Sequence, residues 1–367
     1  MKKAAIVIAD IQLGGGQRSA LNLADALSKD HEVTLIVFHT VDQQYEVPYR
    51  LINIECPDKF TIPGKAFNVL KRAYKLRKHF QTENYDYIFG FMETANFPTV
   101  IASSQAILSV HCNPNELTSY ESILARTLYH RAKHVVAVSE DVATILREDF
   151  KLKKVSRIYN LVSFDQVQEA GAEPYKHDKP YIVALGRLSE VKRLDILVEA
   201  YSRSRIKNDC DLLLVGEGEE RASLEALIDN LGMKDKITLT GSQSNPFTYL
   251  KGAEFLVLSS RTEAFPMVLI ESLVLSTPVV ATDCPTGPRE IVIENENGLL
   301  VENENAEALT ASMDQFYYNK ELFWHCRANA FDSVQHLAAD KVVKEWLALG
   351  DDLPEKPVEA VLQESQT

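Results

Sequence analysis

Short apolar runs alternate with amphipathic stretches along most of the chain. In the first half, runs rich in β-branched residues occupy positions 6–8, 33–37, 87–89, 107–110 and 135–138. A run that is apolar throughout indicates a strand buried on both faces of a parallel sheet. Residues 17–28, 64–80, 119–132 and 140–149, which lie between these runs, have the spacing of helices. This alternation predicts a doubly wound α/β fold.

The alternation is interrupted at about residues 160–178, where we expect an interdomain linker. Strands resume at 181–185 and recur as far as 298–301, followed by helices near 305–319 and 321–349, the second of them kinked. The pattern predicts an N-terminal domain of residues 1–165 and a C-terminal domain of residues 166–335. The polar, acidic tail, residues 351–367, is expected to be disordered.

Composition narrows the class of protein. A chain of 367 residues is long enough for two hydrophobic cores. It contains no run of 18 apolar residues, so we expect no transmembrane helix. The apolar run after the basic N-terminus ends at Asp10, which favours a β-strand over a signal peptide. Five cysteines without a Cys-x-x-Cys pair are typical of reduced thiols in the cytoplasm.

Charge is distributed unevenly between the two halves. Residues 1–165 carry 20 basic and 18 acidic side chains, a net charge of +2, whereas the remainder carries 19 basic and 34 acidic side chains, a net charge of −15. We therefore expect the first half to face any anionic surface that the protein meets.

Two carboxylates, Glu263 and Glu271, are separated by seven residues that include Pro266. Proline is favoured at the first position of a helix, where its missing N–H costs nothing. This places Glu263 in a loop and Glu271 about two turns inside the helix. The unpaired N–H groups of a helix start bind anions, so a diphosphate fits between the two carboxylates.

Two further groups suit an anionic ligand. Arg187 and Lys192 lie five residues apart, just beyond a strand, where fixed cations can neutralise a diphosphate leaving group; the alternative is a solvated basic pair. The loop with Gly14, Gly15 and Gly16 lets backbone amides approach an anion or a sugar, unless it is only a tight turn. A dinucleotide site is disfavoured, because Ser19 replaces the third glycine of that fingerprint and no acid follows the second strand.

Two other motifs leave alternatives open. His111 ends a strand, where it can donate to a sugar hydroxyl or be a satisfied loop residue. Asp209 and Asp211 spell the Asp-x-Asp of metal-dependent glycosyltransferases, but they precede a strand instead of following one. We therefore expect no metal site.

Taken together, these motifs resemble the retaining glycosyltransferases of family 4. The Glu-x7-Glu pair, the Arg187 and Lys192 clamp, the strand ends at Gly216 and Gly241, and residues 278–290 match that family in order and spacing. One departure is Ala264, where the family usually has glycine. The resemblance covers about residues 1–350. It implies a GT-B fold, in which two Rossmann-like domains face each other across a cleft and a C-terminal helix, residues 336–350, returns to the first domain.

The resemblance also implies roles for individual residues. Those expected to be catalytic are Arg187, Lys192, Glu263 and His111. Glu271 is expected to bind the ribose and Glu263 the donor sugar. The residues expected to bind the donor are Gly15, Gly16, Gly186, Gly216, Thr240, Phe265, Pro266, Met267, Val268 and Glu271, and those expected on the acceptor side are Gly14, Gln17 and Arg18.

The implied activity is transfer of a sugar from a nucleotide-sugar, a UDP-linked HexNAc or hexose, to a glycan acceptor with retained configuration and without a metal or cofactor. Residues 278–290 are similar to those of bacterial enzymes that build lipid-linked oligosaccharides and surface polysaccharides, some of them N-acetylgalactosamine transferases. We therefore expect a polyprenyl-diphosphate-linked acceptor. A UDP-N-acetylglucosamine 2-epimerase and a non-catalytic nucleotide-sugar or glycan-binding protein are the alternatives.

Residues 64–80 carry six Lys or Arg and no acid, with Phe67, Leu70, Tyr74 and Leu76 at roughly helical spacing. A basic helix of this kind can lie on an anionic membrane. We expect a cytoplasmic enzyme bound reversibly to the inner face of the cytoplasmic membrane. The alternative is an ordinary packed helix with a basic outer face.

Overall fold

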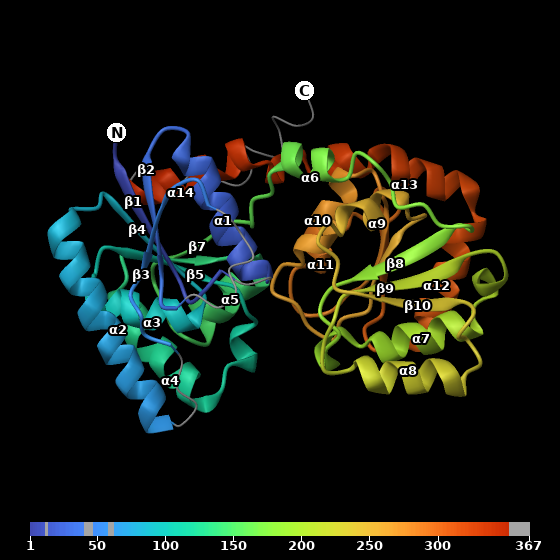
Figure 1. Cartoon of the computed structure of the whole chain (residues 1–367), viewed down its shortest axis with the longest axis horizontal. Coiled ribbons are helices and arrows are strands. Elements are labelled where there is room, and N and C mark those ends of the chain that lie inside the picture. The colour runs from blue at the N-terminus through green and yellow to red at the C-terminus, as the bar shows by residue number, and fades with distance from the viewer. Residues whose placement is uncertain (12–13, 40–46, 58–61, 352–367) are drawn as a thin grey trace. The chain divides into compact units, whose positions relative to one another are not determined.

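The protein, described here from a computed structural model, folds into two compact units (Figure 1). The structure describes residues 1–367 except 12–13, 40–46, 58–61 and 352–367. One unit comprises Met1–Leu161 and the chain from Ala339 onward, and the other comprises Val162–Ala338. The boundary between the units falls within the expected linker, and helix α6 (Phe164–Ala170) forms inside that segment as part of the second unit. Nearly all of the expected disordered tail lies outside the described residues.

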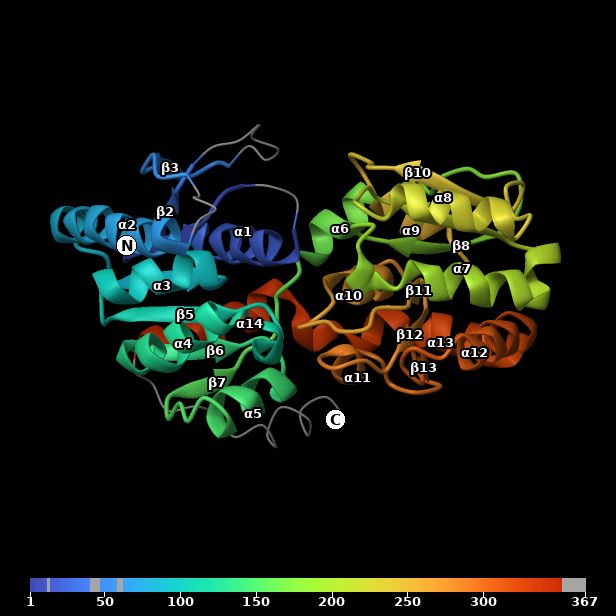
Figure 2. The same ribbon diagram turned by 90° about the horizontal axis from the view of Figure 1, so that it is seen from below.

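The first unit is built on a seven-stranded parallel sheet. Its order is β3-β2-β1-β4-β5-β6-β7, so the direction of winding changes between β1 and β4. Figure 2 labels β3, β2, β5, β6 and β7 in this order across the sheet. Most of these strands are buried along their whole length, as the apolar runs predict. The strands are β1 (Lys3–Ile8), β2 (Glu32–Val37), β3 (Arg50–Asn53), β4 (Tyr87–Phe91), β5 (Ala106–Val110), β6 (His134–Ala137) and β7 (Val155–Arg157).

Helices cover both faces of this sheet. One face packs on α1 (Gly15–Ser28) and on α14 (Ala339–Gly350), which follows the second unit in the chain. The other face packs on α2 (Ile62–Glu83), α3 (Glu93–Ala102), α4 (Ser119–Leu128) and α5 (Glu140–Glu148). The expected return of the last helix to the first domain is confirmed, because Val342, Trp346 and Leu349 of α14 are buried in this core.

The second unit has a six-stranded parallel sheet of order β10-β9-β8-β11-β12-β13. Its strands are β8 (Tyr181–Leu185), β9 (Asp211–Val215), β10 (Ile237–Gly241), β11 (Leu256–Leu258), β12 (Val279–Thr282) and β13 (Gly298–Val301). Its longer helices are α7 (Leu194–Arg203), α8 (Arg221–Asn230), α10 (Met267–Val274), α12 (Ala306–Tyr318) and α13 (Lys320–Ser333), and two short ones are α9 (Phe247–Gly252) and α11 (Pro288–Ile291).

The sequence pattern misses three elements of the first unit. The edge strands β3 and β7 are only four and three residues long, too short for a clear apolar run. Helix α3 contains Pro98, and a proline within a segment is a sequence signal against a helix, because it lacks the N–H group that a helix interior uses. The expected kinked helix at 321–349 is instead two helices, since α13 ends at Ser333 and α14 begins at Ala339.

Trp346 of α14 packs into the core of the first unit. Its ring lies edge-on to Phe89 and is stacked on Phe91, and its side chain is almost fully buried. We expect Trp346→Ala to lower the free energy of unfolding of this unit by about 3–5 kcal/mol, because it leaves a large cavity. Urea unfolding followed by circular dichroism measures the loss.

Trp324 provides a matched control, because it is the chain's other tryptophan and is 61% exposed. Its replacement by Ala should change the free energy by no more than about 0.5 kcal/mol. Equal effects of the two substitutions would show that α14 is not anchored through Trp346.

Candidate functional site

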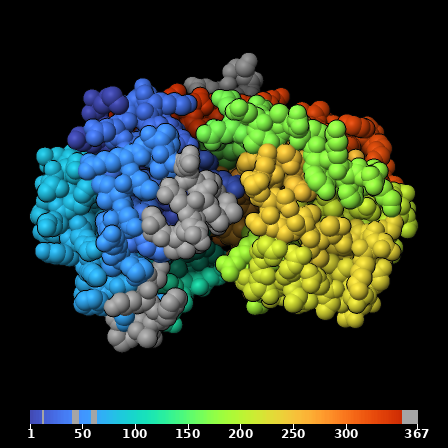
Figure 3. Space-filling model, viewed as in Figure 1, coloured from blue at the N-terminus to red at the C-terminus, as the bar shows by residue number. Residues whose placement is uncertain are grey.

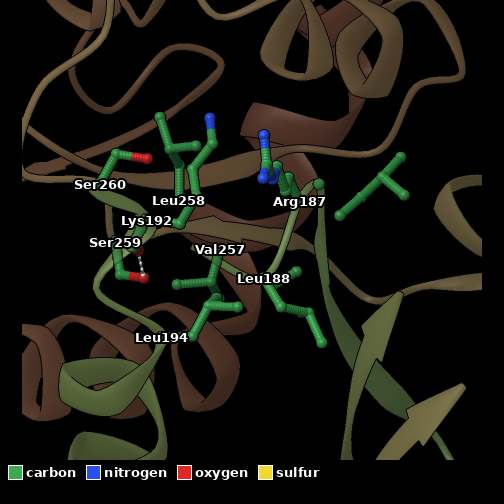
Figure 4. A pocket seen from close by; sticks show the side chains of 11 residues that line it. Arg187, Leu188, Lys192, Leu194, Val257, Leu258, Ser259 and Ser260 are labelled. Carbon is green, nitrogen blue, oxygen red and sulfur yellow. Dashed lines mark hydrogen bonds between the residues drawn. The ribbon is translucent and has the colours of Figure 1, made fainter. Parts of the chain in front are cut away.

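In the second unit, the carboxyl ends of β8 and β11 form a hollow (Figure 4). Ligands of open α/β sheets bind at this edge. The apolar floor includes Val257 and Leu194, and the nitrogen atoms of Arg187 and Lys192 lie on the opposite side. The lining residues are Ala184, Leu185, Gly186, Arg187, Leu188, Lys192, Leu194, Val257, Leu258, Ser259 and Ser260.

Lys192 is paired with Glu263. The Lys192 Nζ lies 2.5 Å from Glu263 Oε1, and only 25% of the lysine side chain and 13% of the glutamate side chain are exposed. The Ser260 hydroxyl donates to the same carboxylate oxygen over 2.6 Å. The Ser259 hydroxyl donates to the Lys192 carbonyl, which attaches the lysine to the end of β11. The structure thus brings together two residues that are 71 positions apart in sequence.

Arg187 projects further into solvent than Lys192. Its side chain is 73% exposed and pairs with Glu219 over 3.0 Å. The neighbouring glycines allow close approach of two loops, because a Cβ on Gly216 would collide with the Gly186 carbonyl oxygen. Thr240 lies near the carboxyl end of β10, two strands from β8 and outside the lining of the hollow, and its hydroxyl donates to the Gly241 carbonyl.

Helix α10 carries the second glutamate of the pair. Pro266 precedes the helix as its N-cap and Met267 is its first residue, so Glu271 lies little more than one turn inside, not two. Glu271 is 2% exposed, and it has interaction partners in the structure, as a buried carboxylate requires. Phe265 and Met267 are also buried, whereas Val268 is partly exposed.

The segment that follows β12 supports the loop of Glu263. The Thr286 N–H and hydroxyl both donate to the Glu263 carbonyl over 2.8 Å, and the Glu263 N–H donates to the Pro285 carbonyl. Gly287 has a φ of +89°, and a Cβ there would lie 2.7 Å from the Ala264 carbonyl oxygen. Any residue larger than glycine at 287 would therefore displace the loop. The sequence pattern did not identify this role for Thr286 or Gly287.

In the first unit, the glycine loop leads into α1. Gly14 is the N-cap in extended conformation, and Gly15 is the first residue of the helix. A Cβ on Gly16 would lie 2.5 Å from Met92 Sδ and 3.6 Å from His111 Cβ, so this glycine allows the loops after β1, β4 and β5 to meet. Gln17 donates to Asp10, and the Arg18 N–H donates to the Gly14 carbonyl.

His111 follows β5 directly and is partly buried. Its Nε2 lies 2.8 Å from the Ser109 Oγ, and its ring stacks on Phe91. Burial lowers the pKa of His111 to about 3, so the ring is neutral at physiological pH. The structure therefore places His111 beside the glycine loop, as a neutral hydrogen-bonding group.

A buried acid lies behind His111. Glu93 opens α3 and interacts with Cys112 and Tyr129, while its Oε1 has no partner among the described residues. Burial raises the pKa of Glu93 to about 7. The sequence pattern missed Glu93 and Ser109. Because side chains alternate along a strand, Ser109 lies on the same side as His111, and this spacing is the sequence signal that could have identified Ser109.

The chain is similar to known glycosyltransferases over nearly its whole length. The model of Glycosyltransferase Family 4 matches residues 13–166, and that of Glycosyl transferases group 1 matches residues 166–332. A Campylobacter jejuni protein named N-acetylgalactosamine-N,N'-diacetylbacillosaminyl-diphospho-undecaprenol 4-alpha-N-acetylgalactosaminyltransferase is 30% identical over 91% of this chain and 97% of the relative. A second C. jejuni alpha-1,4-N-acetyl-D-galactosaminyltransferase is 24% identical over 95% of this chain and 98% of its own.

Solved structures show the same fold. Sucrose-phosphate synthase from Thermosynechococcus elongatus has a TM-score of 0.83 at 18% identity, covering 96% of this chain and 99% of the other. Anabaena HepE in complex with UDP-glucose has a TM-score of 0.79 at 18% identity, covering 96% and 100%. The family models and the relatives show that the protein is a glycosyltransferase, and the solved structures show that it has the GT-B fold. It belongs to glycosyltransferase family 4, the retaining family that the sequence motifs resemble.

The raised pKa of Glu93 gives a pH-dependent prediction. Between pH about 4.5 and 7, the unfolded chain loses this proton while the folded protein keeps it, so stability falls as the pH rises. We expect Glu93→Gln to remove this effect. Relative to the Gln variant, the wild-type protein should lose about 1–3 kcal/mol of unfolding free energy across that window. Urea unfolding at a series of pH values tests this.

The exposed Glu116 serves as the control, since Glu116→Gln should leave the pH profile unchanged. A wild-type profile parallel to that of Glu93→Gln would show that Glu93 is ionised in the folded protein.

Proposed function

We propose that this glycosyltransferase transfers a UDP-linked HexNAc or hexose to a glycan carried on a polyprenyl diphosphate, for bacterial surface polysaccharide or oligosaccharide synthesis. The observation that carries the donor side is the Lys192–Glu263 ion pair beside the start of α10. A diphosphate bound to Lys192, to Arg187 and to the N–H groups at the helix start would be held by cations and a helix dipole together. Glu271, further along the helix, would bind the ribose.

This arrangement suits departure of a nucleoside diphosphate with retained configuration. Negative charge builds up on the phosphate oxygen as the bond to the sugar breaks, and fixed cations at that point stabilise the transition state more than the ground state. When Lys192 turns to the phosphate, the Glu263 carboxylate becomes available to the sugar hydroxyls. In the proposed reaction the departing phosphate takes the acceptor proton on the same face of the sugar.

The acceptor side of the proposal rests on the relatives. Both C. jejuni proteins are named for N-acetylgalactosamine transfer, and the name of each includes an undecaprenol-linked diphospho-glycan. An acceptor of this class is anchored in a membrane, so the enzyme must reach the membrane surface. No helix among the described residues has the length and hydropathy to span a membrane.

The outer face of α2 supports a peripheral membrane contact. Phe67, Leu70 and Tyr74 are 58%, 62% and 71% exposed, and the blue atoms of α2 lie on the surface in Figure 3. At about 100° per residue, Lys71 and Lys78 fall on one side of this apolar stripe and Arg77 on the other, all within roughly 120°. An apolar stripe flanked by cations is the pattern of an interfacial helix. In our proposal the enzyme is cytoplasmic and binds the inner face of the membrane through this helix.

Three of the residues expected on this face point inward instead. Leu76 is fully buried, and the Arg72 guanidinium donates to the Cys56 carbonyl and stacks over Phe38. Lys75 donates to the Ile54 carbonyl. A guanidinium and an ammonium group satisfy carbonyls left unpaired beyond β3, which explains why these cations do not face solvent.

The activity test is a panel of UDP-sugars with undecaprenyl-diphosphate-linked glycans, and product masses are measured. UDP release and a product heavier by one sugar, both requiring the acceptor, are the expected results. Epimerisation at C2 without an acceptor would favour a 2-epimerase. Binding without turnover on any acceptor would favour a nucleotide-sugar-binding protein.

Two substitutions separate the roles within the donor site. Lys192→Ala should lower kcat on the order of 100-fold, because it removes a contact that strengthens as the diphosphate departs. Glu271→Ala should mainly weaken UDP binding, since ribose contacts persist from the ground state to the transition state. Steady-state kinetics and calorimetric UDP titration measure the two effects. A Lys192→Ala variant with wild-type kcat would exclude this lysine from the clamp.

The membrane contact is tested by sedimentation with vesicles. Wild-type protein should bind anionic vesicles at low salt and dissociate at high salt, because each Lys or Arg contributes about 1 kcal/mol near such a surface. Replacing Lys71, Arg77 and Lys78 with Gln should abolish the binding, and replacing Phe67 and Tyr74 with Ser should weaken it at every salt concentration.

The matched control removes the same charge elsewhere in the first unit, at the exposed Lys151, Lys153 and Lys154. That variant should still bind. Loss of binding in both triple variants would mean that only net charge matters, and wild-type protein that ignores anionic vesicles would refute the contact.

A further inference from the structure

His111 is held on two sides by residues of the first unit. Its ring centroid lies 5.3 Å from that of Phe91 at an angle of 28°, and Phe91 in turn stacks on Trp346 of α14 at 5.5 Å. Its Nε2 lies 2.8 Å from the Ser109 Oγ. Both aromatic partners are almost fully buried, so the plane of the imidazole is fixed before any ligand arrives.

The Ser109 hydroxyl settles which ring nitrogen carries the proton. Ser109 is fully buried, and among the described residues Nε2 of His111 is the acceptor within hydrogen-bond distance of its Oγ. If Nε2 carried the proton, the buried hydroxyl hydrogen would be left without an acceptor, which is unfavourable away from water. The hydroxyl therefore donates to Nε2, and the proton of the neutral ring lies on Nδ1.

His111 lies at the carboxyl edge of the sheet, where ligands of such folds bind. His111 follows β5, and the glycine loop that follows β1 approaches it through Gly16. The direction of winding reverses between β1 and β4, and β4 is the neighbour of β5. Ligands of doubly wound sheets bind at such a reversal. Within the described residues, Nδ1 has no hydrogen-bond partner.

We propose that Ser109 is a positioning residue that holds His111 as the Nδ1–H tautomer, so that the ring presents a neutral N–H donor to an oxygen of a bound sugar. The role toward a sugar rests on the proposed transferase function, whereas the tautomer does not. A neutral donor suits a hydroxyl or carbonyl oxygen, which an imidazole in the opposite tautomer would meet with a lone pair.

The tautomer is measured directly in ligand-free protein by ¹⁵N NMR of histidine-labelled enzyme near neutral pH. There are nine histidines, and the His111 signals are identified by their loss in His111→Asn. We expect a pyridine-type shift for Nε2 and a pyrrole-type shift for Nδ1. In Ser109→Ala, the signals should move toward a mixture of the two tautomers. A protonated Nε2 in the wild-type protein would overturn the proposal.

A second pair of variants replaces the ring itself. The amide of Asn can occupy the position of Nδ1, and that of Gln the position of Nε2. His111→Asn should therefore retain more kcat/KM than His111→Gln. Equal loss in both, or better retention by Gln, would contradict a donor at Nδ1 even if Ser109→Ala folds poorly.

The chain contains a matched control for Ser109. His134 Nε2 lies 2.7 Å from the Ser156 Oγ, but His134 is the first residue of β6 and so lies at the amino ends of the strands, away from His111 at the carboxyl end of β5. Ser109→Ala should lower kcat/KM on the order of 3- to 10-fold, because only part of the population keeps the competent tautomer. Ser156→Ala should leave kcat/KM unchanged. Equal losses in both would indicate a general effect on the sheet and overturn the positioning role.

The two proposals fail separately. An Nδ1–H tautomer in a protein that transfers no sugar would leave the assignment of Ser109 intact and refute the transferase proposal. Normal transfer by Ser109→Ala would refute the role of Ser109 in positioning and leave the transferase proposal intact.

Discussion

The ion pair between Lys192 and Glu263 is the interaction on which the proposed donor site of the second unit depends. It joins the loop after β8 to the loop before α10, and the Ser260 hydroxyl and the Thr286 segment hold the glutamate from two further directions. Two partly buried charges are tolerated because each satisfies the other. The same pairing keeps a cation at the edge of the sheet, where, in the proposed function, an incoming diphosphate would replace the carboxylate as its partner.

In the first unit the candidate site is built around a neutral side chain, His111, instead of an ion pair. Burial keeps His111 uncharged, and its hydrogen-bonding direction is set by Ser109 and by the stacked rings of Phe91 and Trp346. The C-terminal helix thus supports the proposed binding edge at His111, which is formed by residues more than 200 positions earlier in the chain. Rigid support of this kind costs nothing at the moment of ligand binding, because the ordering is complete in the folded protein.

Features of the fold and of the candidate site were predictable from sequence where their signal lies in neighbouring residues, and not where they depend on contacts between distant residues. Buried parallel strands are visible as apolar runs, and the Glu263 and Glu271 pair is visible because both residues lie around one helix start. Edge strands β3 and β7 and the proline-containing α3 lack such a local signal. Sequence spacing indicated a basic face on residues 64–80, but it could not show that Arg72 and Lys75 turn toward unpaired carbonyls.

The supporting residues of the site were the hardest to predict. Gly287 matters because of a collision with Ala264, and Thr286 because of bonds to the Glu263 backbone, and both contacts span more than 20 positions. Glu93 is a carboxylate at the first residue of a helix, a position where an acid ordinarily needs no further explanation. Its environment is defined by Cys112 and Tyr129 from other elements, so only the folded structure reveals it.

The proposed exchange of partners at Lys192 is tested most directly by a crystal structure of the protein with UDP. We expect the β-phosphate to lie at the start of α10 within hydrogen-bond distance of Lys192 Nζ, the ribose hydroxyls on Glu271, and the Glu263 carboxylate separated from the lysine. UDP bound elsewhere on the second unit, or bound here while Lys192 stays paired with Glu263 and away from the phosphate, would contradict the role of this ion pair in donor binding.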